Sequence, residues 1–272
     1  MSLTVWVDGE KKLIDALFDK PAFNIKGDLK AEPLTKNYGT VGTAFDYALR
    51  LQVASLNANL VSSFPLVAEQ GIRSNRKRKE FTNEFKEKRR GYLSGQLKIG
   101  DLLRDCVILA KMDNVVRSGK DYPNSDIFSV DEADIEDLQR LTNLVNPNLW
   151  IASNQCFLNP CFGQSSDDLN GADADLIIDS RLIDIKTTKY LKFKRKDFRQ
   201  LVGYQILNIR ENNIYGNIES LGLYFSRFGI LFVFPTPEMH EIVIDGNPVD
   251  KWEAIEESIR RYQQFLSNLK PF

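Results

Sequence analysis

The chain has 272 residues, 43% hydrophobic and 27% charged, which is typical of a globular protein long enough to bury a sizeable core. Lys and Arg total 36 against 37 Asp and Glu, so net charge does not point to a polyanionic partner. One histidine and three cysteines argue against a Ser-His-Asp hydrolase, a histidine-rich metal site and a four-cysteine zinc or iron–sulfur site. No apolar run approaches the roughly 18 residues of a membrane span and no targeting segment is evident, so we expect a cytoplasmic protein with reduced cysteines and no membrane partner.

The first half of the chain is expected to be mostly helical. Residues 1–37 hold only short apolar pieces and predict an irregular N-terminal region. Apolar residues at helical spacing predict a helix over Thr43–Leu60 and a long helical section over Asn75–Asp113. A further helix is expected over Asp131–Val145, with a capping box that starts at Ser129.

The second half supplies the predicted strands. Residues 172–188 read as a hairpin, Lys196–Asn213 as a helix and Ser220–Phe234 as two further strands. An amphipathic helix is expected over Lys251–Leu269. This order predicts one α/β domain over the whole chain, with a mixed central sheet flanked by helices and a helical insertion at about residues 54–145.

The hairpin is predicted to oppose acidic residues. With Asp179-Ser180 as a two-residue loop, Asp175 faces Asp184 and Asp173 faces Lys186. All four side chains then share one face, and opposed residues have Cβ atoms roughly 5 Å apart. Like charges at that separation repel, so a divalent cation between them would remove the conflict.

Mg²⁺, or Mn²⁺, is therefore the expected cofactor. Mg²⁺ prefers hard oxygen ligands, typically one or two carboxylates with water and phosphate oxygens. Asp175 and Asp184 would supply the carboxylates, and the backbone carbonyl of Ile185 would add a ligand. The Lys186 ammonium would orient the attacking water or stabilise charge that develops on a phosphate. The alternative is a solvated strand face with an ordinary Asp–Lys pair, although the surrounding apolar residues favour burial.

These residues resemble the PD-(D/E)XK nuclease superfamily, in particular its RecB-like exonuclease branch. Asp175 matches the first acidic position, and Asp184-Ile185-Lys186 matches the D-x-K element. Gln200-Leu201-Val202-Gly203-Tyr204 matches the Q-x-x-x-Y element of that branch. Helical spacing alone places Gln200 and Tyr204 opposite the apolar stripe, where they would face either solvent or a catalytic cleft. The resemblance favours the cleft.

The resemblance covers about residues 41–51 and 155–207, and it has departures. Val41–Leu51 resembles the helix that often carries a His or Glu near the metal, but this chain has Asp46 there. Ala174 stands where the family has a proline before the first acid. Asp46 is thus a further candidate ligand, and Asp173 an alternative first acid if the register differs.

The resemblance implies a restriction-endonuclease-like core and a metal-dependent nuclease, most simply an exonuclease, that hydrolyses DNA phosphodiester bonds. Asp175, Asp184 and Lys186 would carry the catalysis, and Gln200 and Tyr204 would position the DNA strand or support the lysine. Nucleases of this branch serve repair, recombination and defence against foreign DNA.

Two basic segments are compatible with single- or double-stranded DNA as the partner. Arg73–Lys98 has ten basic residues and three Glu, and Lys186–Arg199 has seven basic residues and one Asp. Both interleave aromatic residues, so they would follow a phosphate backbone and stack on bases. The alternative is a solvated helix face, the commoner meaning of a charge run.

Two other functions remain open from the sequence. One is a catalytically silent nucleic-acid-binding subunit on the same fold, which the intact Asp–Asp–Lys set disfavours. The other is a metal-dependent phosphohydrolase of small molecules, which the extended basic segments disfavour. The sequence does not decide between cleavage from ends and within strands, between DNA and RNA, or between oligomeric states.

Overall fold

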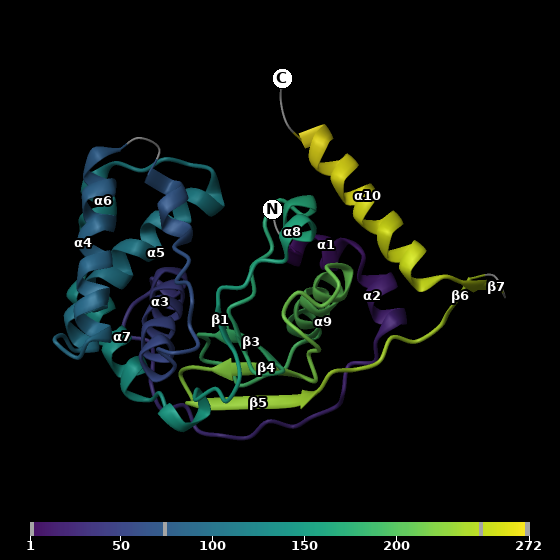
Figure 1. Cartoon of the computed structure of the whole chain (residues 1–272), viewed down its shortest axis with the longest axis horizontal. Coiled ribbons are helices and arrows are strands. Elements are labelled where there is room, and N and C mark those ends of the chain that lie inside the picture. The colour runs from purple at the N-terminus through teal and green to yellow at the C-terminus, as the bar shows by residue number, and fades with distance from the viewer. Residues whose placement is uncertain (1–2, 73–74, 245–246, 270–272) are drawn as a thin grey trace.

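A five-stranded mixed sheet forms the centre of the molecule, with helices on both faces, as the sequence predicts (Figure 1). The computed structural model describes residues 3–72, 75–244 and 247–269. The strands lie side by side in sequence order, and only the β3–β4 pair is parallel. They are β1 (Cys156–Leu158), β2 (Leu176–Ile178), β3 (Arg181–Lys186), β4 (Ser220–Phe225) and β5 (Ile230–Pro235).

The β2–β3 hairpin has the predicted register. Leu176 pairs with Ile183, and the next two pairs follow in step to the Asp179-Ser180 turn. Asp179 has φ of 51°, the left-handed conformation that such turns require and that Asp tolerates. The ladder is shorter than expected, because it ends at Leu176. Asp173 forms an isolated bridge with Cys161 instead of pairing with Lys186, which corrects that part of the prediction.

Helix α9 (Arg195–Arg210) makes the crossover between the parallel strands β3 and β4 and covers one face of the sheet. Two consecutive parallel strands need such a crossover, because a tight turn joins only strands that run in opposite directions. Leu182 and Leu223 point to this face and join a core with α9 and α1 (Leu3–Gly9). Gly203 permits that contact, since a Cβ there would lie 2.8 Å from Cγ1 of Val7.

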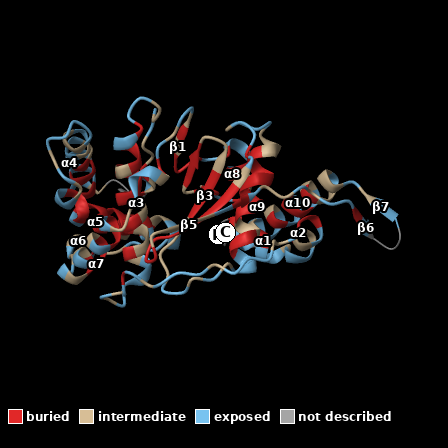
Figure 2. Ribbon diagram, turned by 90° about the horizontal axis from the view of Figure 1, so that it is seen from below, coloured by how far each residue is buried: buried red, intermediate tan, exposed pale blue. Residues whose placement is uncertain are grey.

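Helix α3 (Tyr38–Leu56) covers the opposite face. Side-chain alternation along β3 and β4 sends Ile183 and Tyr224 to this side. The Tyr224 ring stacks on Phe45 of α3 with ring centroids 6.2 Å apart and meets Trp150 edge-on at 4.8 Å. Figure 2 shows buried residues running through the sheet and the inward faces of the helices on both sides.

The helices expected between residues 54 and 145 are present and pack beyond α3, at the left of Figure 1. They include 3-10 turns before α4, before α5 and after α7. The elements are η1 (Val67–Ile72), α4 (Arg76–Leu93), η2 (Ile99–Leu102), α5 (Leu103–Ser118), α6 (Asn124–Phe128), α7 (Glu132–Asn143) and η3 (Pro147–Leu149). The expected capping box at Ser129 is wrong, because Asp131 caps α7 by accepting the N–H of Ala133 at 3.0 Å.

The N-terminal region is more ordered than predicted. It contains α1 and α2 (Lys11–Leu17), which both pack against α9. Their apolar residues, among them Trp6 and Ile14, are buried, so tertiary contacts stabilise helices too short to be stable alone.

The C-terminal helix α10 (Lys251–Leu269) has the predicted bounds and contacts α2. It follows a small separate hairpin of β6 (Ile242–Ile244) and β7 (Asn247–Val249), while α8 (Gly163–Asp168) lies between β1 and β2 in sequence. Within the described ranges, no helix combines the length and apolar character that crossing a membrane would need.

Candidate active site

The two predicted metal-binding carboxylates lie at the open end of the β2–β3 hairpin. Asp184 is buried near the end of β3 and points to the α9 face, as Leu182 does. Asp175 lies one residue before β2 and is partly exposed. Its Oδ2 accepts the backbone N–H of Ile185 at 2.5 Å, so the carboxylate continues the hairpin where the ladder stops.

The same contact orients the carbonyl of Ile185. In an antiparallel pair, a hydrogen-bonded residue uses both its N–H and its C=O to bond the residue opposite. Both groups therefore point to the same neighbouring strand. The Ile185 N–H points to Asp175, whereas the Lys186 carbonyl accepts the N–H of Ser226 beyond the β4 side. The Ile185 carbonyl therefore lies on the edge that Asp175 occupies, where the sequence analysis placed a ligand.

Lys186 is held by three side chains. Its Nζ lies 2.7 Å from Oδ2 of Asp184 and 3.7 Å from Oδ1 of Asp197, and it donates to Oε1 of Gln200 at 2.9 Å. Burial lowers the pKa of Lys186, but the charges of Asp184 and Asp197 outweigh it and raise that pKa overall. The ammonium therefore stays protonated, as a donor and a positive charge.

Gln200 and Tyr204 face this site and not solvent. Gln200 Nε2 lies 3.2 Å from the Tyr204 hydroxyl, which in turn donates to the backbone carbonyl of Asp173 at 2.6 Å. Tyr204 is only 5% exposed, so the solvent-facing alternative for this helix face is wrong. A continuous set of hydrogen bonds thus runs from Lys186 through α9 to the segment that precedes Asp175.

Charge is concentrated among these residues. Burial and the charge of Asp184 raise the pKa of Asp175 well above its usual range. Burial also raises the pKa of Asp184, although Lys186 opposes the shift. Burial, followed by the charges of Asp175 and Asp184, keeps the pKa of Tyr204 well above normal, so its hydroxyl remains a donor. Placing a cation among the carboxylates would relieve this repulsion.

Asp46 lies near the pair but is tied to another partner. Its Oδ2 forms an ion pair with Arg50, one turn along α3, at 2.6 Å. Its charge contributes to the raised pKa of both Asp175 and Asp184. Asp173, the alternative first acid, contributes its carbonyl to Tyr204, and burial raises the pKa of its carboxyl.

The residues present fit a hard cation with two carboxylate ligands. Buried Oδ2 of Asp184 and Oδ1 of Asp46 have no hydrogen-bond partner, although the former pairs with Lys186 by charge. Within the described parts of the chain, no three Asp, Glu, His or Cys side chains form a group that could hold a metal ion. Asp46 is thus not brought into a three-ligand group, and Asp175, Asp184 and the Ile185 carbonyl are the candidate ligands that could hold Mg²⁺.

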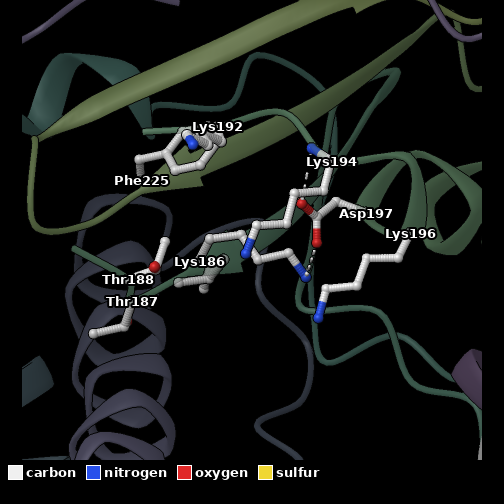
Figure 3. Close-up of a pocket in the computed structure, with 9 residues that line it drawn as sticks. Lys186, Thr187, Thr188, Lys192, Lys194, Lys196, Asp197 and Phe225 are labelled. Atoms are coloured by element: carbon white, nitrogen blue, oxygen red, sulfur yellow. Dashed lines mark hydrogen bonds and ion pairs between the residues drawn. The ribbon is translucent and has the colours of Figure 1, made fainter. Parts of the chain in front are cut away.

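Asp197 is a further residue of the candidate site that the sequence pattern did not predict. This residue lies in the first turn of α9, where its Oδ2 accepts the backbone N–H of Lys194 at 3.2 Å while Oδ1 faces Lys186 (Figure 3). The available signal was its position as the single acid among seven basic residues in Lys186–Arg199.

The two basic segments differ in their relation to the site. Lys186–Arg199 adjoins it directly. The Arg73–Lys98 segment, of which residues 73–74 lie outside the described part, forms α4 at the far edge of the molecule in both Figure 1 and Figure 2. Within α4, Arg78 is buried and pairs with Asp121 at 2.7 Å, which is a structural role.

Comparisons of the chain with models of protein families, with curated proteins and with solved structures found no match.

Proposed function

We propose that the chain is a Mg²⁺- or Mn²⁺-dependent nuclease of the PD-(D/E)XK type, similar to the RecB-like branch, that hydrolyses phosphodiester bonds in DNA. The observation that carries the proposal is the connected set Asp184, Lys186, Gln200 and Tyr204, with the Asp175 carboxylate bonded to the backbone N–H of Ile185 beside it. Asp–x–Lys on a strand and Gln–x–x–x–Tyr on a helix are separate in sequence, and the fold joins them through one hydrogen bond.

The order of elements also supports the proposal. Helix α3, the β1–β2–β3 meander, the crossover helix α9 and β4 follow the helix, strand hairpin, helix and strand of a restriction-endonuclease-like core. The basic segment after β3 would follow the DNA backbone away from the site.

A cation held by Asp175, Asp184 and the Ile185 carbonyl would polarise a phosphoryl oxygen and lower the pKa of a bound water. Lys186 stays protonated beside Asp184, so its ammonium orients the attacking water as a donor or neutralises developing negative charge. Gln200 fixes the ammonium, and Tyr204 anchors Gln200 to the backbone at Asp173.

The test is incubation of the purified protein with single- and double-stranded DNA, linear and circular, with and without Mg²⁺ or Mn²⁺. We expect metal-dependent cleavage of linear DNA that is lost in Asp184→Ala and Lys186→Ala. Asp167→Ala and Lys12→Ala serve as matched controls, because both residues are exposed and lie outside the motif.

Binding without cleavage under every metal condition would overturn the nuclease and favour the silent DNA-binding subunit. Cleavage of a small phosphodiester with no activity on DNA would favour the small-molecule phosphohydrolase. Loss of activity in the two control variants would show that the losses at Asp184 and Lys186 are not specific.

A further inference from the structure

A second feature of the site is a pocket of about 230 Å³ next to Lys186. It lies between the loop that follows β3 and the first turn of α9, and Phe225 at the end of β4 forms an apolar wall (Figure 3). The lining residues are Ile185, Lys186, Thr187, Thr188, Lys192, Lys194, Lys196, Asp197 and Phe225.

The pocket holds an excess of positive charge. Four lysines line it against a single acid, Asp197. Lys186 is neutralised in part by Asp184, whereas Lys192, Lys194 and Lys196 form no ion pair with any residue in the described ranges.

The arginines of the same segment are used differently. Arg199 pairs with Asp15 of α2 at 2.6 Å, and Arg195 lies 3.3 Å from the same carboxylate. The arginines thus dock α2 on α9, whereas Lys192, Lys194 and Lys196 line the pocket. In the basic segment Lys186–Arg199, Asp15 therefore neutralises the two arginines, whereas the charges of the pocket lysines remain largely uncompensated.

The lysine side chains are also gathered. In Figure 3 the Lys186 ammonium points to the Asp197 carboxylate, and the side chains of Lys194 and Lys196 extend toward the Lys186 side chain from either side. Like charges that converge repel unless an anion lies among them. The Thr188 hydroxyl accepts the backbone N–H of Tyr190 at 3.2 Å and so keeps its own proton to donate. These donors are the groups that bind phosphate oxygens.

We propose that this pocket binds a phosphate monoester at the end of a DNA strand; the proposal rests on the nuclease function above. A phosphodiester carries one negative charge, whereas a monoester carries about 1.5 to 2 at neutral pH, which better matches three unpaired lysines. Lys186 belongs to both the pocket and the catalytic set, so an end phosphate bound here lies directly beside the carboxylates. Ile185 and Phe225 provide apolar surface for the attached sugar.

The test compares one labelled oligonucleotide in three forms, with a 5′-phosphate, with a 3′-phosphate and with hydroxyl ends. Binding is measured by fluorescence anisotropy in EDTA, so that it does not depend on cleavage, and kcat/KM is measured with Mg²⁺ or Mn²⁺. We expect one phosphorylated form to bind about tenfold tighter than the hydroxyl form, the lower end of what charge-assisted hydrogen bonds contribute. The same form should be cleaved faster.

The double variant Lys192→Gln/Lys194→Gln and the variant Lys196→Gln should bring the affinity ratio of phosphorylated to hydroxyl ends close to one. Lys12→Gln, an exposed lysine on α2 away from the pocket, should keep the ratio. Thermal unfolding checks that each variant is folded.

Equal affinity of the wild type for all three forms would overturn the proposal that the pocket binds an end phosphate. A preference for phosphorylated ends that survives in the folded lysine variants would overturn it as well. Because binding is read without metal, this decision does not depend on cleavage. Absence of cleavage with every metal, despite a binding preference, would instead overturn the nuclease and leave the phosphate pocket standing.

Discussion

Replacing Asp175 with Asn is expected to stabilise the metal-free protein while abolishing its response to metal. Asp175 directly precedes the Leu176–Ile183 pair that ends the β2–β3 ladder, and burial together with the charge of the neighbouring Asp184 raises its pKa. Asn keeps the oxygen that accepts the Ile185 N–H and removes only the charge. A residue retained at the expense of stability is typical of a functional site.

The magnitude follows from the geometry of the hairpin. Opposed residues have Cβ atoms about 5 Å apart, and two unit charges at that distance repel by about 3 kcal/mol at an effective dielectric constant of about 20. The attraction between Asp175 and Lys186 offsets part of this, so we expect a net gain of about 1 to 2 kcal/mol in the free energy of unfolding. For a chain of this size that is a rise in Tm of about 2 to 8 °C.

The response to metal should move in the opposite direction. A cation at about 100 times its Kd stabilises the native state by about 2.7 kcal/mol, which would raise the Tm of the wild type by about 5 to 10 °C. The same concentration should leave the Tm of Asp175→Asn unchanged, because the site has lost one of its two carboxylates.

The assay is thermal unfolding of the wild type and Asp175→Asn in EDTA and in a titration of MnCl₂ or MgCl₂, with DNA cleavage measured in parallel. Asp167→Asn, an exposed carboxylate on α8, is the matched control and should change the unfolding free energy by less than about 0.5 kcal/mol. A lower Tm for Asp175→Asn in EDTA would refute the repulsion, and an undiminished metal-induced rise would refute its role as a ligand.

Three further predictions test the supporting contacts. Lys186→Gln should lower kcat by about 100- to 1000-fold, as loss of one preorganised transition-state donor does, while a denaturant titration shows that the fold is retained. Arg227→Leu should cost about 3 to 5 kcal/mol in urea unfolding, because Arg227 and Asp137 form an ion pair in which each side chain is 1% exposed, and a loss below 1 kcal/mol would contradict a buried, unpaired Asp137. The hydrogen bond from Arg199 lowers the pKa of Asp15, so this pair should contribute up to about 1 kcal/mol above the unfolded pKa of about 3.9 and lose it as pH falls through the lower folded value. The unfolding free energies of wild type and Asp15→Asn should therefore differ by a constant amount above about pH 5 and converge below about pH 4.

Local chemistry was enough to predict how Asp184 and Lys186 are arranged in the candidate site. A two-residue turn at Asp179-Ser180 fixes the register of the hairpin, and alternation then places Asp184 and Lys186 on one face. The bounds of α10 and the two strands over Ser220–Phe234 also follow from local periodicity and turn residues. These features depend on neighbours within a few residues, which is why a single sequence contains them.

Other features depend on contacts between distant segments, and the sequence did not disclose them. Helices α1 and α2 are short and have weak patterns, and they are stabilised by packing on α9. The β2–β3 ladder stops at Leu176 because the Asp175 side chain, and not a main-chain carbonyl, accepts the Ile185 N–H. The alternation of apolar and polar residues does not show whether a strand N–H is bonded by a backbone carbonyl or by a side chain.

The segment Lys186–Arg199 shows the same limit for charge. Its composition predicts an anion partner but not which cations are available to it, because that depends on where Asp15 lies in the fold. Once α2 packs on α9, Arg195 and Arg199 are occupied, and the charge that remains is that of the lysines around one concave pocket. The segment thus contains two kinds of basic residue. The arginines hold α2 against α9, and the lysines are available to bind an anion. Asp15→Ala should release Arg195, leave Arg199 with only its 3.7 Å pair to Asp8, and raise the affinity for DNA of any end chemistry, whereas the lysine variants should lower the affinity for phosphorylated ends most.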